Sequence, residues 1–588
     1  MTTHQSTADR SILDCIDTDE HDDLSQIDQK IQSIEEEMRR LADSLQRLRA
    51  QRNARTLISR LPAEILTHIF TYCVPSRWYR TSIHTKWHSF THVCHSWRSI
   101  ALDHASLWTC IDFSSMELAR TMLERSKTAI LDIMVQGHHV GRDEKRRELL
   151  KVIKLQFFRI GHMEVCSYTF RGLFDGLVQP SPSLRSLALI NYDRDDPVNL
   201  PDQFLGGNAP LLSHITLHSV YLPWHSPLPI LQSLTSLVLT GNHFTNLPTG
   251  RPLFDTLRNV PRLEFLNLAG IFPISIMETD IIPLPKLRQL DLGLRSEDFD
   301  RCTGFVEHLE FPESTALNIN YIITSEDASV FDPLLSYLSR TFSKNENESA
   351  TVESPRTIKA LALVFTDFGF GVCIELNAWN IGTIPFECKP SLRPPSILGL
   401  ELTWRHSRAN PPSSNPDVLK AVLRPFSMHS IETFHIDYQC NFGRDSGSDG
   451  GGNLEDDPVN NLEKYLGPLP WSTSIRTLGI YGSSSFPKQL LSALLSIGCG
   501  LAESGLTVES STPFPATQTL VLLDSRLGYS GVGFESFARM LADALVLRMK
   551  SGHDLEKLII KTSCQMTEET FAILKEVVEE FELEQTEP

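Results

Sequence analysis

Near the N-terminus, hydrophobic residues follow one another in alternating steps of three and four. This alternation is the a/d pattern of a coiled coil, and it predicts a helix over residues 24–56. Arg52 and Arg55 take the next a and d positions and end the apolar seam. The helix either forms a homodimer through the segment from Leu24 to Leu48 or folds back as a single amphipathic helix. The seam consists of Leu24, Ile27, Ile31, Ile34, Met38, Leu41, Leu45 and Leu48.

Two shorter stretches with helical spacing follow, between Leu57 and Trp108. Pro62 stands where a first-turn proline is tolerated, and Glu64 carries a charge that suits the positive end of a helix. Two short helices this apolar cannot hide all their side chains between themselves, so they must pack on something else. The apolar positions are Ile65, Leu66, Ile69, Phe70 and Cys73 in the first stretch and Phe90, Val93, Cys94, Trp97 and Ala101 in the second.

These two blocks, taken in order, resemble an F-box over residues 57–112. The resemblance rests on LPAEILTHIFTYC, which starts at Leu61, and on VCHSWRSIA, which starts at Val93. Three features depart from the family pattern. His95 stands where an arginine is common, Ala105 and Ser106 replace a frequent proline, and the insert at 76–89 is longer than in a minimal F-box. The same residues also suit an ordinary pair of core helices.

The resemblance implies that the chain is the substrate-recognition subunit of a cullin-based, SCF-type ubiquitin ligase. In that family the F-box docks on a Skp-type adaptor, and the ubiquitin chemistry resides elsewhere in the complex. Part of the apolar set must still face inward as the domain's own core, and we expect Phe70 and Trp97 there. The residues from which the resemblance implies adaptor contacts are Leu61, Pro62, Ile65, Leu66, Ile69, Val93 and Trp97.

Beyond the F-box-like stretch, a leucine pattern recurs every 22 to 29 residues, roughly the period of leucine-rich repeats. Leucines at alternate positions predict a short strand with one buried face. Looser copies of the pattern flank the clear ones, from Leu131 to Leu555. Apolar residues with helical spacing predict outer helices at 332–342, 417–426, 488–501 and 535–549. The clearest copies of L-x-x-L-x-L begin at Leu184, Leu212, Leu234, Leu263 and Leu287.

The predicted fold class is therefore α/β, with an N-terminal α-helical segment and then an irregular leucine-rich-repeat solenoid of horseshoe shape. Polar inserts at 343–357, 406–416 and 442–460 read as loops of the solenoid. The predicted domains are a disordered acidic tail at 1–23, a heptad helix at 24–56, an F-box at 57–112, the solenoid at 113–575 and an acidic tail at 576–588.

A solenoid of this kind would bind its protein substrate with the residues that alternate with the buried leucines. Phe265 is the main candidate because an exposed aromatic is a common anchor, although it could equally pack as filler on the sheet. The substrate itself is not identifiable from the sequence. The candidate positions are Ser236, Val238, Thr240, Phe265, Asn267, Gln289 and Asp291.

Charge and cysteine content narrow the class of protein further. The formal net charge is −18 and no basic patch is visible, which argues against a nucleic-acid partner. The 11 cysteines form no C-x-x-C pair, which is typical of a reducing compartment. Neither a secretory signal nor a membrane-length apolar run occurs. We therefore expect no membrane association and an intracellular protein of the cytoplasm, the nucleus or both.

No catalytic motif stands out in the sequence. His84, His88, His92 and His95 recur at helical spacing, but they lie opposite the apolar stripe and read as a solvated face rather than a zinc site. We expect no catalytic residue, no metal and no cofactor, so the chain is not predicted to be an enzyme. Two alternatives remain, an F-box scaffold without ligase activity and an enzyme hidden in the irregular second half.

Overall fold

The computed structural model describes residues 24–74, 84–113, 115–136, 143–167, 177–193, 198–223, 229–241, 250–273, 281–295, 298–323, 331–342, 357–367, 371–382, 394–405, 430–440, 474–481, 514–524, 531–550, 552–562 and 567–585. The chain divides into two compact units. The first holds Met1–Val135, Gly141–Leu149 and Arg159–His162, and the second holds Gln136–Val140, Leu150–Phe158 and Met163–Pro588.

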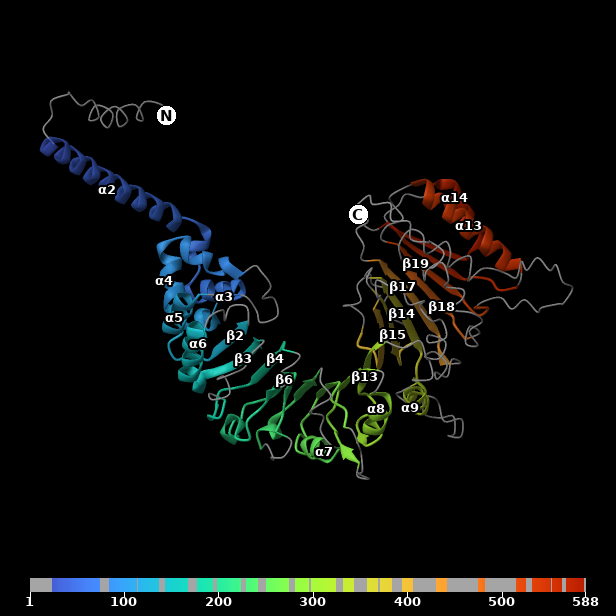
Figure 1. The fold of residues 1–588 in the computed structure, drawn as a ribbon. Helices are drawn as coiled ribbons and strands as arrows, with labels where there is room; N and C mark the ends of the chain where they lie inside the picture. Colours follow the sequence, from blue (N-terminus) through green and yellow to red (C-terminus); the bar gives the residue numbers. More distant parts are fainter. Residues whose placement is uncertain are drawn as a thin grey trace. The chain divides into compact units, whose positions relative to one another are not determined.

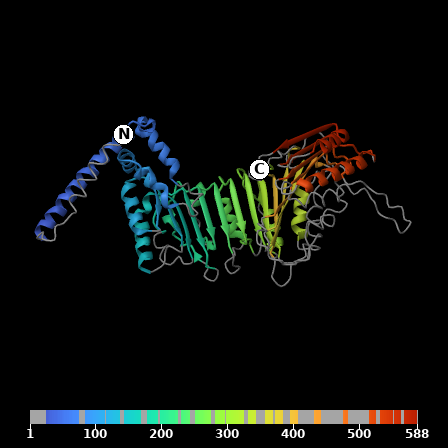
Figure 2. The same ribbon diagram turned by 90° about the horizontal axis from the view of Figure 1, so that it is seen from above.

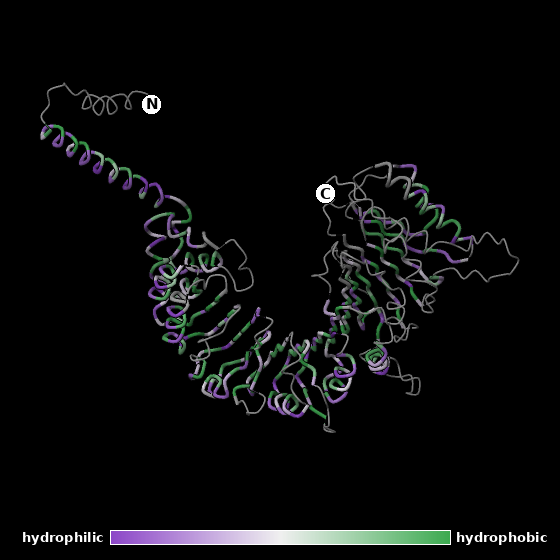
Figure 3. The backbone as a smooth tube through the Cα atoms, in the orientation of Figure 1, coloured by the Kyte–Doolittle hydropathy of each residue, from purple (hydrophilic) through white to green (hydrophobic). Residues whose placement is uncertain are grey.

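The first unit begins with the long helix α2 (Leu24–Ala54), over the range where the heptad pattern predicts one. None of its residues is buried. Hydrophobic and hydrophilic residues alternate along its turns (Figure 3). The helix ends at Ala54, and the Asn53 carbonyl oxygen accepts hydrogen bonds from Thr56 Oγ1 and Ser59 Oγ of the following segment, each at 2.7 Å.

A series of short helices follows α2. The second predicted stretch is not one helix, since Cys94 is extended and separates a 3-10 helix from an α-helix. A small β–α–β unit completes this region, in which β1 and β2 pair in parallel. The elements are η1 (Leu57–Arg60), α3 (Ala63–Cys73), η2 (His84–His92), α4 (His95–Asp103), η3 (Ala105–Trp108), β1 (Cys110–Asp112), α5 (Met116–Arg125), β2 (Leu131–Gln136), α6 (Asp143–Gln156) and η5 (Phe157–Arg159).

The second unit is built on a large mixed sheet with helices. Each copy of the leucine pattern, clear or loose, forms a strand. The first series pairs in parallel and in chain order, so its strands stand side by side (Figure 2). This first series comprises β4 (Ser186–Asn191), β6 (His214–His218), β8 (Ser236–Thr240), β9 (Phe265–Ala269), β11 (Gln289–Leu294) and β13 (Ala316–Ile323), and β3 (Ile160–Ser167) precedes it in the chain.

Burial alternates along these strands as the leucine pattern predicts. Leu237, Leu266 and Leu290 are fully buried, whereas the residues on either side of each are half-exposed. The helices α7 (Gly250–Arg258), α8 (Phe299–Val306) and α9 (Asp332–Phe342) lie along the same side of the strands (Figure 1). The sheet therefore has one face packed against helices and one face that is only partly covered.

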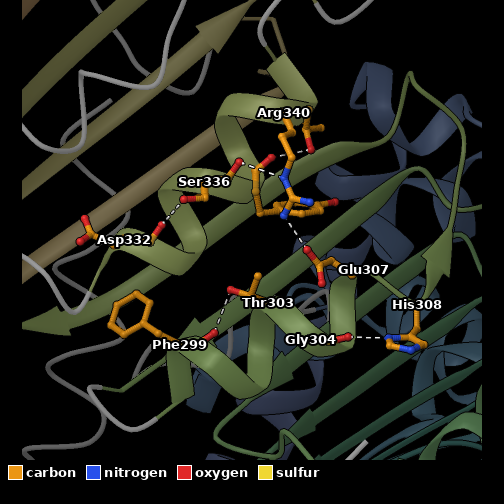
Figure 4. Close-up of polar contacts among 10 residues, drawn as sticks. Phe299, Thr303, Gly304, Glu307, His308, Asp332, Ser336 and Arg340 are labelled. Carbon is orange, nitrogen blue, oxygen red and sulfur yellow. Dashed lines mark hydrogen bonds and ion pairs between the residues drawn. The ribbon is translucent and has the colours of Figure 1, made fainter. Parts of the chain in front are cut away.

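The helices α7, α8 and α9 contact one another through aromatic and polar side chains. Phe254 of α7 stacks on Phe305 of α8 with ring centroids 5.7 Å apart. Figure 4 shows the junction of α8 and α9, where Arg340 Nη2 lies 2.5 Å from Glu307 Oε1. The helix predicted at 332–342 is thus present as α9, with Leu334, Leu335 and Leu338 buried.

The strand order departs from chain order after β13. The spatial order is β13, β16 (Leu398–Arg405), β15 (Gly371–Trp379), β14 (Ala360–Asp367) and β17 (Thr433–Cys440). β15 runs antiparallel to both neighbours, and the other pairings are parallel. A solenoid that adds one repeat after another would keep β14 next to β13, and the strands depart from that order in this region.

Burial also changes in this second part of the sheet. Consecutive residues Ala360 to Val364 of β14 are all buried, and so are Thr433 to Asp437 of β17. Strands buried on both faces are near-continuous apolar runs rather than alternating ones, as the segment ALALV shows. The alternating burial of β4 to β13 therefore does not continue into β14 and β17.

The C-terminal strands continue in parallel to the end of the described chain. β18 (Thr477–Tyr481), β19 (Thr519–Asp524), β20 (Lys557–Thr562) and β21 (Glu580–Gln585) follow β17 in order. The prediction of an acidic tail at 576–588 is wrong for residues 580–585, because they form β21. Glutamates of β21 form ion pairs with lysines of β20. Lys557 Nζ lies 2.6 Å from Glu582 Oε1, and Lys561 Nζ lies 2.6 Å from Glu584 Oε2. The helices here are α13 (Gly531–Lys550), which covers the predicted 535–549, and α14 (Glu568–Val577).

Several predicted segments lie outside the described residues. They are the tail at 1–23, the helices at 417–426 and 488–501, and almost all of the inserts at 343–357, 406–416 and 442–460. Within the described ranges, no helix has both the length and the apolar character that crossing a membrane requires.

Candidate functional site

Helix α3 begins at a proline, as the sequence predicts. Pro62 is the N-cap, and its carbonyl oxygen accepts hydrogen bonds from the N–H groups of Ile65 and Leu66, both at 3.1 Å. Glu64 adds a negative charge to the first turn, next to the positive end of the helix dipole. The start of α3 is thereby fixed, and with it the direction in which each apolar residue points.

The inward face of α3 packs on the rings of the following elements. Phe70 is 1% exposed and stacks on Phe90 of η2, with ring centroids 4.6 Å apart. Trp97 of α4 lies at 5.1 Å from Phe70 in a tilted arrangement. Leu66 is also buried in this core. Phe70 therefore lies in the core as expected, Trp97 packs against it but is only partly buried, and Leu66 offers no surface to a partner.

The outward face of α3 is an apolar stripe open to solvent. Leu61, Ile65 and Ile69 are 36%, 47% and 39% exposed. Ile65 and Ile69 are four positions apart and lie on one side of α3, and Leu61 lies just before the N-cap residue Pro62. Tyr72, one turn beyond Ile69, is exposed as well. We call Leu61, Ile65, Ile69 and Tyr72 the α3 stripe.

The second sequence block places Val93 and Trp97 differently. Cys94 caps α4, because its Sγ accepts the Trp97 N–H at 3.5 Å. Val93, just before the cap, is more than half exposed, whereas Trp97 is only partly so. Among the predicted contact residues, Leu61, Pro62, Ile65, Ile69 and Val93 are thus exposed.

The end of this helical region is anchored to α5. Trp108 Nε1 donates a hydrogen bond to the Ala101 carbonyl oxygen at 2.8 Å, and the Arg125 guanidinium lies 4.3 Å from the Trp108 ring centroid. Burial and the nearby Arg98 lower the pKa of Arg125 from its ordinary value. Trp108, which the sequence argument used only as a boundary, joins the short helices to the β–α–β unit.

A buried arginine fixes the end of α5 in turn. Arg159 Nη1 donates to the Ser126 hydroxyl at 3.1 Å and to the Ala129 carbonyl at 3.0 Å, and Arg159 Nη2 donates to the Leu123 carbonyl at 3.4 Å. Burial lowers the pKa of Arg159. No sequence motif marks this residue, because its partners lie roughly thirty positions away along the chain.

The predicted histidine face carries no metal constellation. The rings of His88 and His92 are 5.8 Å apart, edge to face. In the described parts of the chain, no group of three or more His, Cys, Asp or Glu side chains is placed to hold a metal ion.

The buried cysteines do not have the character of nucleophiles. Burial raises the pKa of Cys166 to about 11 and that of Cys373 to about 12, and it also raises the pKa of Cys302. The thiolate is the reactive form of cysteine, and these three side chains hold their protons far above neutral pH.

A second candidate surface is the partly open face of β8, β9 and β11. Register aligns Ser236, Phe265 and Gln289 in one row across the strands and Val238, Asn267 and Asp291 in the next. All of these side chains are half-exposed, and so is Thr240. The sequence placed these residues on one face correctly, since the register keeps them opposite one another.

One corner of this face is fixed by hydrogen bonds. Gln289 Nε2 donates to Asp291 Oδ1 at 2.9 Å, and Asn318 Nδ2 of β13 donates to the same oxygen at 2.8 Å. Gly293 lies so close to Ala269 that an added Cβ would stand 2.5 Å from the Ala269 Cβ, so only glycine suits that position. Asn318 was not predictable from the leucine pattern, because β13 lacks the full pattern.

Comparison with known families identifies the first of these two surfaces. Residues 58–114 match the family model described as F-box-like. No curated protein matches the chain. The α3 stripe therefore belongs to an F-box-like domain, and proteins with this domain are generally non-catalytic adaptors that take part in substrate recognition by SCF-type ubiquitin ligases.

Proposed function

We propose that this F-box-like protein is the substrate-recognition subunit of a cullin-based, SCF-type ubiquitin ligase. Its F-box-like domain binds a Skp-type adaptor, and the large sheet binds the target protein. The observation that carries the proposal is the α3 stripe, an exposed apolar row inside the matched domain. Exposed apolar patches on a folded domain mark interaction surfaces.

The adaptor contacts come from the α3 stripe together with Pro62 and Val93. These side chains are exposed, whereas Phe70, Leu66 and Trp97 supply the core that holds them in place. Contact with an apolar surface would remove the exposed aliphatic groups from water, which contributes about 25 cal/mol for each Å² buried. Leu66 is left out of this set because it is buried in the free protein.

The sheet is an irregular leucine-rich-repeat solenoid in this proposal. Its support is that strands occur at every copy of the leucine pattern, that β4 to β13 pair in parallel and in order, and that α7, α8 and α9 cover one side. The reversed block of β14, β15 and β16 interrupts the regular repeats.

The target binds on the half-exposed face of β8, β9 and β11. Ser236, Val238, Thr240 and Asn267 give this face a neutral character, and Phe265 gives it an aromatic anchor. The one carboxylate in its central rows, Asp291, already accepts hydrogen bonds from Gln289 and Asn318. Such a face suits a neutral protein surface with an apolar side chain opposite Phe265.

The chain performs no chemistry itself in this proposal, and ubiquitin transfer occurs on other subunits. It acts inside the cell, in the cytoplasm, the nucleus or both, where ubiquitin ligases of this type operate. A scaffold that binds the adaptor but recruits no cullin is the second function compatible with the same domain.

Titration of a purified Skp-type adaptor against the wild-type protein and the Ile65→Asp variant tests the proposal. The carboxylate introduced by Ile65→Asp would be buried without a partner in the contact with the adaptor, at a cost of several kcal/mol. That cost corresponds to a loss of affinity of about a hundredfold or more. Thr71→Asp is the matched control, because Thr71 is exposed on the same helix but about a third of a turn away from Ile65.

We expect Thr71→Asp to bind like the wild type and both variants to keep their helical circular dichroism. Wild-type protein that does not bind the adaptor, or Ile65→Asp that binds normally, would leave the segment as a pair of core helices. Co-purification of a cullin with the adaptor complex then separates the ligase subunit from the scaffold.

A further inference from the structure

Helix α2 presents an apolar face that the described part of the chain leaves exposed. Six large apolar side chains on it are between 49% and 78% exposed, and no residue of the 31-residue helix is buried. A helix of this length gains most of its stability in water from packing of its apolar face. The six side chains are those of Leu24, Ile31, Met38, Leu41, Leu45 and Leu48.

The spacing of this face specifies the kind of partner. The apolar positions follow a strict seven-residue repeat, whereas the face of a straight α-helix drifts by about 20° per heptad. Side chains in such a seam remain in contact with a partner helix along its whole length only when two or more helices supercoil around each other. Apolar residues fill the a positions Leu24, Ile31, Met38 and Leu45 and the d positions Ile27, Ile34, Leu41 and Leu48.

We propose that α2 forms a parallel, in-register coiled-coil dimer with α2 of a second copy of this chain. Lys30 then occupies a g position and reaches Glu35 of the other copy, which occupies the e position of the next heptad. The symmetry of the dimer makes this attraction occur twice.

The remaining flanking positions are compatible with this arrangement. Within the described helix, the other g–e pairs between copies join Glu37 with Ala42 and Ser44 with Arg49, so like charges do not meet. Glu37 also has a cation on its own helix, since its Oε2 lies 3.9 Å from Arg40 Nη1.

An antiparallel pair is disfavoured by the charges at the middle of the seam. Aligned over the same seam, from Leu24 to Leu48, an antiparallel copy brings the centre of the helix against its own centre. That centre is Glu35, Glu36 and Glu37, so like charges would face one another. The parallel arrangement avoids this and places Lys30 beside Glu35.

The test uses charge reversal on the full-length chain, with the dimer dissociation constant measured by analytical ultracentrifugation. Lys30→Glu and Glu35→Lys each set like charges opposite one another, so each should weaken the dimer about tenfold. The double variant Lys30→Glu/Glu35→Lys restores opposite charges in a parallel homodimer and should recover wild-type affinity.

Glu36→Lys is the matched control. Glu36 has an arginine four positions later, as Glu35 does, but it lies at the outward f position. It should therefore change the helix as much as Glu35→Lys does and leave the dissociation constant unchanged. Leu41→Glu, which puts a charge inside the seam, should give particles of 66.3 kDa, the mass of one chain.

Three results would overturn the proposal. They are wild-type protein that remains monomeric up to high micromolar concentration, equal weakening by Glu35→Lys and Glu36→Lys, and failure of the double variant to recover. Binding of the Skp-type adaptor, measured on the same samples, confirms that every variant retains a folded F-box-like domain.

Discussion

Arg159 is buried and is held by hydrogen bonds at the C-terminal end of α5. Replacing it by alanine would remove the donor to the Ala129 carbonyl, a hydrogen bond from a charged group that contributes about 1.5–3 kcal/mol, whereas the Leu123 carbonyl keeps its hydrogen bond from Ser126 Oγ at 2.8 Å. Hydrogen exchange of the amides at the C-terminal end of α5 should accelerate accordingly. Arg120→Ala is the control, because it breaks only the exposed ion pair with Glu148, which contributes at most about 1 kcal/mol. Equal exchange in the two variants would contradict the assignment.

The cysteines should divide sharply in their reactivity. Cys73 is exposed, whereas Cys166 and Cys373 are buried, with pKa values raised to about 11 and about 12. Alkylation at pH 8 followed by mass spectrometry should modify Cys73 and spare the buried pair until the protein is denatured. Since the folded state keeps these protons to higher pH than the unfolded chain, the free energy of unfolding should fall as pH rises above 9.0, the ordinary pKa of the thiol.

For single residues of the F-box-like helices, the sequence shows which side chains are apolar but not which of them face the core and which face solvent. Ile65 and Leu66 are neighbours in one apolar run, yet one is exposed and the other buried. The difference depends on Phe90 and Trp97, which reach α3 from separate elements. Helical spacing alone cannot place those rings, so Leu66 was predicted as a contact residue.

Among the longer strands, those with a clear or loose copy of the leucine pattern were predictable, whereas β13, β15 and β21 were not. β13 and β15 do alternate, with Leu317 and Ile319 in the first and Ile374 and Leu376 in the second buried. They lack the leading leucine of the pattern, however. β21 has glutamates at alternate positions, and its sequence was therefore predicted to be an acidic tail. Its strand depends on Lys557 and Lys561, which belong to another element.

Deleting residues from 579 onward tests whether β21 supports its neighbour. The deletion removes β21 from the edge of β20 and takes Phe581 away from Phe571, whose ring centroid lies at 5.0 Å. Amides of β20 that bond to β21 should then exchange faster with solvent. Deleting only residues 586–588 is the control and should leave exchange in β20 unchanged. An unstructured acidic tail would make the two deletions equivalent.

For the whole molecule, the sheet face should determine which protein is captured. Phe265→Ala should reduce recovery of the target by more than tenfold, because truncating a central aromatic anchor costs about 2 kcal/mol or more. Phe158→Ala is the control, since Phe158 is 61% exposed but lies outside the strands. Quantitative mass spectrometry of captured proteins measures both. Recovery unaffected by Phe265→Ala would move target binding away from β9.

The reversed order of β14, β15 and β16 also has a consequence for how the protein folds and evolves. A regular repeat array can lose or gain one unit, and it can fold by adding neighbours one after another. Here β13 pairs with β16 and β14 pairs with β17, so each of these pairings can form only after a strand much later in the chain has been synthesised. Residues from β13 to β17 therefore have to form together as one cooperative block. Whole-repeat duplications should be tolerated between β4 and β11 and eliminated by selection within that block.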